Sequence, residues 1–370
     1  MSYKVKFKDI TINLDKRRKP LNGADREKIS IKKLYPYCGA NSVMDYVDEY
    51  LFDEEILCVA EDGGKWGKNE TCSYIMNEKC WVNNHAHVIK VKENVDIRYL
   101  KHWLNYSNLN SYITGAIVRK LTQKELNELE IFLPDKSEQI KTSDVIDKCE
   151  EIIDIRKKQI EQLDESIKSQ FVKMFENNKY EQKSLKDIAN IGSSKRIYAN
   201  EYRENGIPFY RSKEIRELGS GLKPSTELFI SKEKYNEVKR KYGIPKKGDI
   251  LIAAIGATIG YMWIVDDSEF YYKDGNLILV SSKSGTNPIY LKYTLEKNIN
   301  QFKRNGASGS AQLAMTIEKV ENFIISMPPI ELQNQFAEFV KQVNKQKSVI
   351  QKSLEETQKL QESLMNKYFG

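Results

Sequence analysis

The segment LEIFLPDKSEQIKTSDVIDKCEEIIDIRKKQIEQLDESIKSQFVKMF (129–175) decides how this chain is built. After Pro134 it contains neither Gly nor Pro, and its apolar residues recur at spacings of three and four, as in a helix with one apolar face. That stripe consists of Ile146, Cys149, Ile153, Ile160, Leu163, Ile167, Phe171 and Met174. A helix of about 40 residues is about 60 Å long, which is too long for the interior of a compact domain.

A second segment of the same kind ends the chain. Its apolar stripe consists of Phe336, Val340, Val343, Ile350, Leu354, Leu364 and Tyr368. Each stripe needs an apolar partner, and we expect the two helices to pair with each other as a coiled coil. The alternative is that each is an ordinary amphipathic helix lying on its own domain.

The two halves of the chain share one plan, because several short motifs return in the same order. The pairs are FKDI (7–10) with LKDI (185–188), YPY (35–37) with IPF (207–209), EIL (55–57) with DIL (249–251), and YLK (99–101) with YLK (290–292). Further on, Thr122, Leu126, Leu129, Ile131 and Pro134 recur 194 residues later as Thr316, Val320, Phe323, Ile325 and Pro328.

The segments before the two helices have a different sequence pattern from the helices. They carry short β-type runs such as ILCVA (56–60) and LILVS (277–281), bounded by Gly, Asn and Asp and mixed with shorter helical stretches. The sequence therefore predicts an α+β fold in which two pseudo-repeated α/β domains are separated by two long helices. We place the first domain at 1–133, the first helix at 134–178, the second domain at 179–327 and the second helix at 328–370.

Composition points to an intracellular protein with an anionic partner. The chain has 59 Lys+Arg against 52 Asp+Glu, a net charge of +7 that suits a polyanion. Its five Cys form no C-x-x-C pair, which indicates free thiols in the reducing cytoplasm. The N-terminus lacks the apolar core of a signal peptide. The uncharged stretch ILIAAIGATIGYMWIV (250–265) is interrupted by Gly256 and Gly260, so we predict two buried strands around a glycine turn and no membrane contact.

The usual catalytic and metal-binding motifs are missing from the sequence. Gly63, Gly67 and Lys68 fall one residue short of a phosphate-binding P-loop, and Asn69 stands where Ser or Thr is required. Cys72, Cys80, His85 and His87 have metal-binding side chains, but their spacing matches no zinc motif. Three His in total leave little material for acid–base catalysis. We therefore predict no catalytic residues and no metal.

The basic residues recur at matching places in both halves, which favours a nucleic-acid contact over an ordinary solvated surface. Bases are read by Arg, Lys, Asn, Gln, Ser and Thr, with aromatic side chains packed beside them. In the first half the candidate DNA-binding residues are Lys16, Arg17, Arg18, Lys19, Tyr37, Asn41, Ser42, Lys65, Trp66, Lys68, Asn83, His85, Arg119 and Lys120. In the second half they are Ser193, Ser194, Lys195, Arg196, Tyr210, Arg211, Ser212, Lys213, Lys273, Asn276, Lys303, Arg304, Ser308, Ser310 and Gln312.

On these residues the chain resembles the specificity subunits of type I restriction–modification systems. The segment 129–175 resembles the family's long helix after a P-P-x-x-E-Q pattern, and FIISMPPIELQNQF (323–336) is its second copy. VKFKDI (5–10) and KSLKDIANIGSS (183–194) resemble the start of each target recognition domain, and GAN (39–41), EDGG (61–64) and WVNNHAHVI (81–89) one variety of such domains. Asp135 replaces the second Pro of the first copy, and Leu332 replaces the Glu of the second.

The resemblance implies a non-catalytic protein that binds double-stranded DNA. Each domain would read one half of a bipartite, asymmetric site, and the antiparallel helices would set the gap. Two methyltransferase subunits carrying S-adenosylmethionine would dock on the chain, flip out an adenine and methylate it. Restriction or translocase subunits would join for cleavage. No cofactor is expected to contact this chain directly.

Two other interpretations remain open at this point. One is the specificity chain of a type IIB-like enzyme, whose partner fuses nuclease and methyltransferase. The other is a helical adaptor that binds protein or RNA; it predicts basic loops that are unrelated between the repeats. A free-standing enzyme is disfavoured by the missing motifs.

Overall fold

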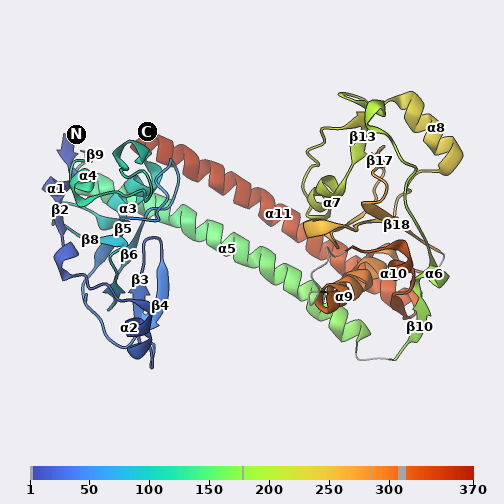
Figure 1. The fold of residues 1–370 in the computed structure, drawn as a ribbon, viewed down its shortest axis with the longest axis horizontal. Coiled ribbons are helices and arrows are strands. Elements are labelled where there is room, and N and C mark those ends of the chain that lie inside the picture. The colour runs from blue at the N-terminus through green and yellow to red at the C-terminus, as the bar shows by residue number, and fades with distance from the viewer. Residues whose placement is uncertain (1–2, 177–178, 284, 307–313) are drawn as a thin grey trace. The chain divides into compact units, whose positions relative to one another are not determined.

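A computed structural model describes residues 3–176, 179–283, 285–306 and 314–370 (Figure 1). The chain forms two compact units: unit 1 comprises Met1–Lys158 with Ile350–Gly370, and unit 2 comprises Gln159–Val349. Both long helices, α5 (Lys136–Phe175) and α11 (Ile330–Phe369), contribute to both units. Our division of the chain into four segments remains a prediction.

Unit 1 is built around a fully antiparallel sheet in the order β2-β8-β5-β6, beside a smaller sheet β4-β3-β7 and the pair β1-β9. Strands β3 and β7 run parallel. The strands are β1 (Tyr3–Lys6), β2 (Thr11–Asn13), β3 (Tyr35–Cys38), β4 (Val43–Val47), β5 (Ile56–Ala60), β6 (Ser73–Met76), β7 (Trp81–Val82), β8 (Ala86–Val91) and β9 (Glu130–Leu133). The central strand β5 is ILCVA, buried at every position, as an apolar run between two neighbours should be.

Short helices cover the sheets of unit 1. They are α1 (Phe7–Ile10), η1 (Asp15–Arg17), α2 (Gly23–Lys28), α3 (Ile97–Tyr106), η2 (Asn110–Tyr112) and α4 (Gln123–Asn127). Helix α3 begins at Asp96, whose carboxylate accepts hydrogen bonds from the backbone N–H groups of Arg98 and Tyr99, as an N-cap residue does. Its apolar face packs against Leu57, Ile89 and other core residues.

Unit 2 repeats this plan. Its sheets run β11-β18-β15-β16 and β12-β14-β13-β17, with the pair β10-β19, and β13 lies parallel to β17 as β3 does to β7. The strands are β10 (Glu181–Ser184), β11 (Ala189–Gly192), β12 (Tyr202–Arg203), β13 (Ile207–Tyr210), β14 (Phe229–Ile230), β15 (Ile250–Ala253), β16 (Met262–Ile264), β17 (Tyr271–Tyr272), β18 (Leu277–Ser282) and β19 (Ile324–Met327). The helices are α6 (Leu185–Ile188), η3 (Ala199–Glu201), α7 (Ser212–Gly219), α8 (Lys232–Tyr242), η4 (Gly256–Thr258), α9 (Pro288–Gly306) and α10 (Ile317–Glu321).

The repeat extends to single buried side chains. Gln139 and Gln333 lie 194 residues apart in the first turns of α5 and α11, and each is 0% exposed. The Gln139 amide accepts from the backbone N–H of Asp96 and donates to the carbonyl of Pro134. The Gln333 amide does the same with Asn287 and Pro328. Each glutamine thus ties the start of a long helix to the segment leading into α3 or α9.

Within unit 2 the two long helices pack against each other. Phe171 and Phe175 of α5 both lie 5.4 Å from Phe336 of α11, measured between ring centroids. Lys347, a charged residue that interrupts the apolar stripe of α11, forms an ion pair with Asp164 of α5. Because Asp164 lies opposite Lys347 while Phe175 lies opposite Phe336, the helices are antiparallel. In unit 1, Phe369 of α11 packs 5.1 Å from Tyr99 of α3.

The stretch 250–265 forms β15, a short turn with Gly256 and Gly260 at positive φ, and β16, as the sequence predicts. Most of its apolar residues are buried in the core of unit 2, whereas Tyr261 in the turn is exposed. Among the described helices, none is both long and apolar enough to cross a membrane.

Candidate nucleic-acid interface

In each unit, the loop that follows the first strand of one four-stranded sheet (β2 in unit 1, β11 in unit 2) meets the loop that precedes the strand paired with it (β8 or β18). In unit 1 these are the loops after β2 and before β8, joined by residues 61–63 and by Lys120; we call this set the unit 1 loop cluster. In unit 2 they are residues 193–196 and 273–276, the unit 2 loop cluster. Many of the candidate DNA-binding residues lie in these two clusters.

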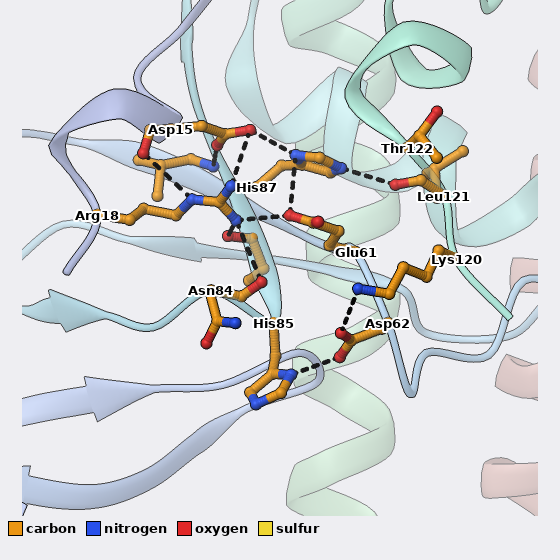
Figure 2. Close-up of polar contacts among 12 residues, drawn as sticks. Asp15, Arg18, Glu61, Asp62, Asn84, His85, His87, Lys120, Leu121 and Thr122 are labelled. Carbon is orange, nitrogen blue, oxygen red and sulfur yellow. Dashed lines mark hydrogen bonds and ion pairs between the residues drawn. The ribbon is translucent and has the colours of Figure 1, made fainter. Parts of the chain in front are cut away.

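Arg18 holds the unit 1 loop cluster together. Its guanidinium donates from Nη1 to Glu61 Oε2 and to the carbonyl of Ala86, both at 2.7 Å, and pairs through Nη2 with Asp15 (Figure 2). The side chain is only 14% exposed. Because these donors already have protein acceptors, Arg18 joins the loops to each other and is poorly placed to bind DNA.

His87 is buried beside this arginine. Its Nδ1 lies 2.6 Å from Asp15 Oδ2 and its Nε2 lies 2.7 Å from the carbonyl of Leu121, and both partners are acceptors. Burial raises the pKa of Asp15, but the hydrogen bonds from His87 and from the Val88 N–H lower it more, leaving it below its usual value. Asp15 is therefore ionised, and Arg18 and His87 both lie against its carboxylate.

The outer edge of the cluster is built on Asp62. His85 Nδ1 lies 2.5 Å from Asp62 Oδ1, and Lys120 Nζ lies 3.2 Å from Oδ2 (Figure 2). Burial raises the pKa of Asp62, but these two hydrogen bonds lower it below its usual value. The Asn41 side chain donates to the carbonyl of Gly63 next to it, at 3.0 Å. His85, Lys120 and Asn41 thus gather at one edge, and His85 remains 48% exposed.

The other exposed candidates of unit 1 are more scattered. Lys16, Ser42 and Lys65 are exposed, Lys19 lies over the Trp81 ring, and Arg17 pairs with Glu54. Arg119 donates to Asn110, and Lys68 reaches Asn366 at the end of α11. The structure therefore brings some candidates together around Asp62 and leaves others apart.

The unit 2 loop cluster is also hydrogen-bonded. Ser194 Oγ donates to the carbonyl of Tyr272 at 2.7 Å, and Ser193 Oγ to that of Leu277 at 3.2 Å. The backbone N–H of Lys195 donates to the Tyr271 hydroxyl. Arg196 donates from Nε to Asp274 Oδ2 at 2.7 Å, and Lys273 and Asn276 flank that aspartate. Six candidate residues thus share one surface region.

The remaining candidates of unit 2 lie elsewhere. Arg211, Ser212 and Lys213 begin α7, where Arg211 pairs with the buried Glu214 and Lys213 with Glu227. Lys303 and Arg304 lie in the last turn of α9. Ser308, Ser310 and Gln312 fall outside the described residues.

Four candidates belong to the interior and not to the surface. Tyr37, Trp66 and Asn83 are 2, 4 and 3% exposed, and Tyr210 is 5% exposed and stacked on Phe270. Aromatic type and a loop-like setting suggested DNA contact, but these side chains pack in the cores, where a duplex cannot reach them. We remove them from the proposed DNA surface.

Sequence reasoning missed the acidic residues that organise both clusters. Asp62 and Asp274 contact the exposed basic side chains, yet a search for cationic and amide residues passes over carboxylates. The signal was present: Asp62 lies in EDGG (61–64) and Asp274 in KDGN (273–276), and both are turn sequences.

Two groups of side chains within the described residues have metal-binding types: Asp15, Glu61 and His87, and His102, Asp147 and Glu150. Arg18 already supplies the cation of the first group, and Lys101 pairs with Asp147 and Glu150 of the second. The set Cys72, Cys80, His85 and His87 does not come together; Cys72 contacts the carbonyl of Leu104 instead.

Comparison with known proteins agrees with this arrangement of two repeated, loop-bearing units and two long helices. The sequence matches the type I restriction modification DNA specificity domain twice, over residues 3–165 and 177–359. A Haemophilus influenzae protein assigned as a type I restriction enzyme specificity subunit is 31% identical over 339 residues, covering 86% of this chain and 81% of the relative. The type I restriction enzyme MjaVIII specificity subunit of Methanocaldococcus jannaschii is 24% identical over 391 residues, covering 95% and 88%.

Solved structures share the fold. The S subunit of a type I restriction–modification system from M. genitalium superposes with a TM-score of 0.67 at 13% identity, covering 100% of this chain and 96% of that one. A chain from a study of complex assembly and conformational transition in a type I system gives 0.55 at 15% identity, covering 100% and 97%.

The fold and the paired loops define a protein made of two repeated recognition units. The chain belongs to the family of type I restriction modification DNA specificity domains, and it carries two of them. It is a DNA specificity subunit, which selects the sequence and leaves catalysis to other subunits. This family favours the type I interpretation over the type IIB-like chain, the adaptor and the free-standing enzyme, and the double match confirms the internal repeat.

Proposed function

We propose that each unit of this specificity subunit reads one half of a bipartite, asymmetric DNA site through its loop cluster, and that α5 and α11 set the gap between the halves. One observation carries this proposal. The same pair of loops is built twice, once on the equivalent sheet of each unit, and each time with an arginine, an aspartate and exposed polar side chains. Two copies of a surface that differ in detail suit two half-sites that differ in sequence.

The catalytic partners follow from this assignment. We propose that two methyltransferase subunits dock on the chain, one for each repeat, that they hold S-adenosylmethionine, and that they methylate an adenine in each half-site. Restriction or translocase subunits would join the same assembly. A twofold internal repeat supports this stoichiometry because it offers two equivalent places for one kind of subunit.

We further propose that the protein acts on DNA in the cytoplasm. The five cysteines, Cys38, Cys58, Cys72, Cys80 and Cys149, are all buried as free thiols, a state that a reducing compartment maintains.

The independence of the half-sites is tested by exchanging residues 179–327 for the equivalent part of a relative. The exchanged chain is expressed with its methyltransferase subunits, and the methylated motif is mapped across the genome. One half of the motif should change while the other half and the gap stay as they were. A change in both halves would show that the units read DNA jointly and would refute the modular proposal.

The spacer role is tested by changing helix length. Matched insertions of four residues, in α5 between Ile153 and Ile160 and in α11 between Ile350 and Leu354, lengthen each helix by about 6 Å and keep the apolar stripes nearly in phase. One base pair spans about 3.4 Å, so the preferred gap should grow by one or two base pairs.

Matched two-residue insertions are the control for this test, because they rotate the downstream stripes by about 200° and should impair folding or assembly. An unchanged gap in a folded, active four-residue variant would show that the helices do not measure the DNA.

A further inference from the structure

The two repeats use equivalent arginines for different purposes. Arg18 follows β2 and Arg196 follows β11. Each contacts the loop before the strand that pairs with that strand, β8 in unit 1 and β18 in unit 2. Arg18 is 14% exposed and surrounded by acceptors (Figure 2), whereas the Arg196 side chain is 63% exposed. The same position therefore supplies a structural tie in unit 1 and an outward-facing cation in unit 2.

Arg196 is exposed but held in place. Its Nε donates to Oδ2 of Asp274, a carboxylate that is itself only 12% exposed. The other oxygen of Asp274 is buried and has no hydrogen-bond partner within the described residues, so Arg196 is the one ionic partner of this carboxylate found there. Within the same described ranges, neither Nη1 nor Nη2 of Arg196 makes a hydrogen bond or ion pair. The guanidinium is thus held from one edge and presents two N–H donor groups from the other.

The loops that carry this pair are tied to the strands beneath them. Ser193 and Ser194 hydrogen-bond to the backbone on either side of residues 273–276, and the Ser193 hydroxyl also accepts from the N–H of Gly275 at 3.3 Å. A donor pair that is ordered before binding loses less conformational entropy when it meets its target.

The ligand of such a fork must offer two acceptors side by side. In the major groove, guanine presents O6 and N7 in that arrangement, and a DNA phosphate presents two oxygens. The carboxylate of Asp274 decides between them. Its negative charge lies against the guanidinium and opposes the approach of an anionic phosphate, while it leaves the hydrogen bonds to a neutral base unopposed.

We propose that Arg196, positioned by Asp274, reads a guanine in the half-site of unit 2 through both of its Nη groups. Arg18 builds its loop cluster and reads no base, so the first half-site depends on the edge at Asp62 and His85. This inference rests on the proposed function, since it assumes that unit 2 reads a half-site of its own.

The test uses the full chain in its complex with its methyltransferase subunits. Arg196→Ala, Arg196→Lys and Asp274→Asn are compared with wild type for binding to a DNA library in which every base pair of the methylated motif is varied. Arg240→Ala, which removes an exposed arginine of α8 in the same unit, is the matched control. Thermal unfolding verifies that each variant is folded.

Arg196→Ala should reduce discrimination at one G·C pair of the second half-site by roughly 10- to 100-fold and leave the first half-site unchanged. Arg196→Lys should lose nearly as much, because an ammonium cannot form the planar fork. Asp274→Asn should lose part of this discrimination in the wild-type background and nothing further in the Arg196→Ala background, as expected of a residue that acts through Arg196. A purely structural aspartate would add its own loss in both backgrounds.

Two outcomes would overturn the inference. Equal weakening on every sequence, with a salt dependence reduced by about 0.9 in log–log slope, would make Arg196 a phosphate contact. Unchanged discrimination at every base pair would make it a bystander. If either occurs while the exchange of 179–327 still changes one half-site, only this inference fails. If that exchange changes both halves, the modular proposal itself fails.

Discussion

Gln139 and Gln333 offer a direct test of the repeated architecture, because the same substitution can be made once in each unit. In Gln333→Leu the side-chain volume is nearly kept while the amide is lost. The backbone N–H of Asn287 and the carbonyl of Pro328, each 2.9 Å from that amide, lose their partner. A buried polar group left unpaired costs about 1–3 kcal/mol, so two of them predict a loss of roughly 2–6 kcal/mol.

For a unit of 150–250 residues, such a loss lowers the melting temperature by roughly 4–24 °C. Gln139→Leu should cost unit 1 a similar amount, since its amide bonds to Asp96 and Pro134 are 2.9 and 2.8 Å long. The assay is hydrogen exchange followed by mass spectrometry across a urea series, which reports peptides of each unit separately. Gln333→Leu should raise exchange in α9 and β19, and Gln139→Leu in α3 and β9.

Gln335→Leu is the matched control, because Gln335 lies two residues further along α11 and is exposed. We expect it to change stability by less than about 0.5 kcal/mol. If Gln333→Leu behaves like this control, or if each variant loosens both units equally, then the two glutamines do not lock their own helices, and the argument from buried hydrogen bonds is wrong.

Three further predictions follow from single contacts. Replacing Lys16, Arg17 and Lys19 by Ala should weaken binding to every DNA sequence, and the slope of log K against log salt concentration should become shallower by up to about 0.9 per lost phosphate contact, without a loss of stability. Arg18→Ala should instead destabilise unit 1 in urea, because Asp15 and Glu61 lose their cation. Burial raises the pKa of Asp147, but the hydrogen bond from His102 and nearby positive charges bring it below its usual value. Its carboxylate therefore stabilises unit 1 above the unfolded pKa of about 4, and the decrease in urea midpoint caused by Asp147→Asn should become smaller as pH falls through the folded pKa. Phe336→Ala, which removes a fully buried ring lying 5.3–5.4 Å from three others, should cost unit 2 about 3–5 kcal/mol by chemical unfolding, whereas Phe132→Ala, at a ring 64% exposed, should cost little.

Local patterns in the sequence were enough to predict the two-part plan of this protein. The helical stripe from Ile146 to Met174 and the return of FKDI as LKDI each depend on spacing along the chain, and spacing is what determines which face of a helix is apolar. The stretch 250–265 was recognisable for the same reason, since glycines at the turn separate two apolar runs. These features survive folding because neighbours in the chain remain neighbours in the element.

The role of each candidate site residue depended on partners that are distant in the sequence. Arg18 and Arg196 look alike as basic loop residues, but Glu61 and Ala86 reach the first, while Asp274 takes one edge of the second. In the sequence, Trp66 and Tyr210 likewise look like aromatic residues that stack on bases, but in the structure both are buried in the cores. Charge and residue type are local properties, whereas burial and the occupation of hydrogen-bond donors are set by the whole chain. The sequence by itself therefore determined the repeat, the long helices and the family, and only the tertiary structure decided which of the two equivalent arginines is exposed.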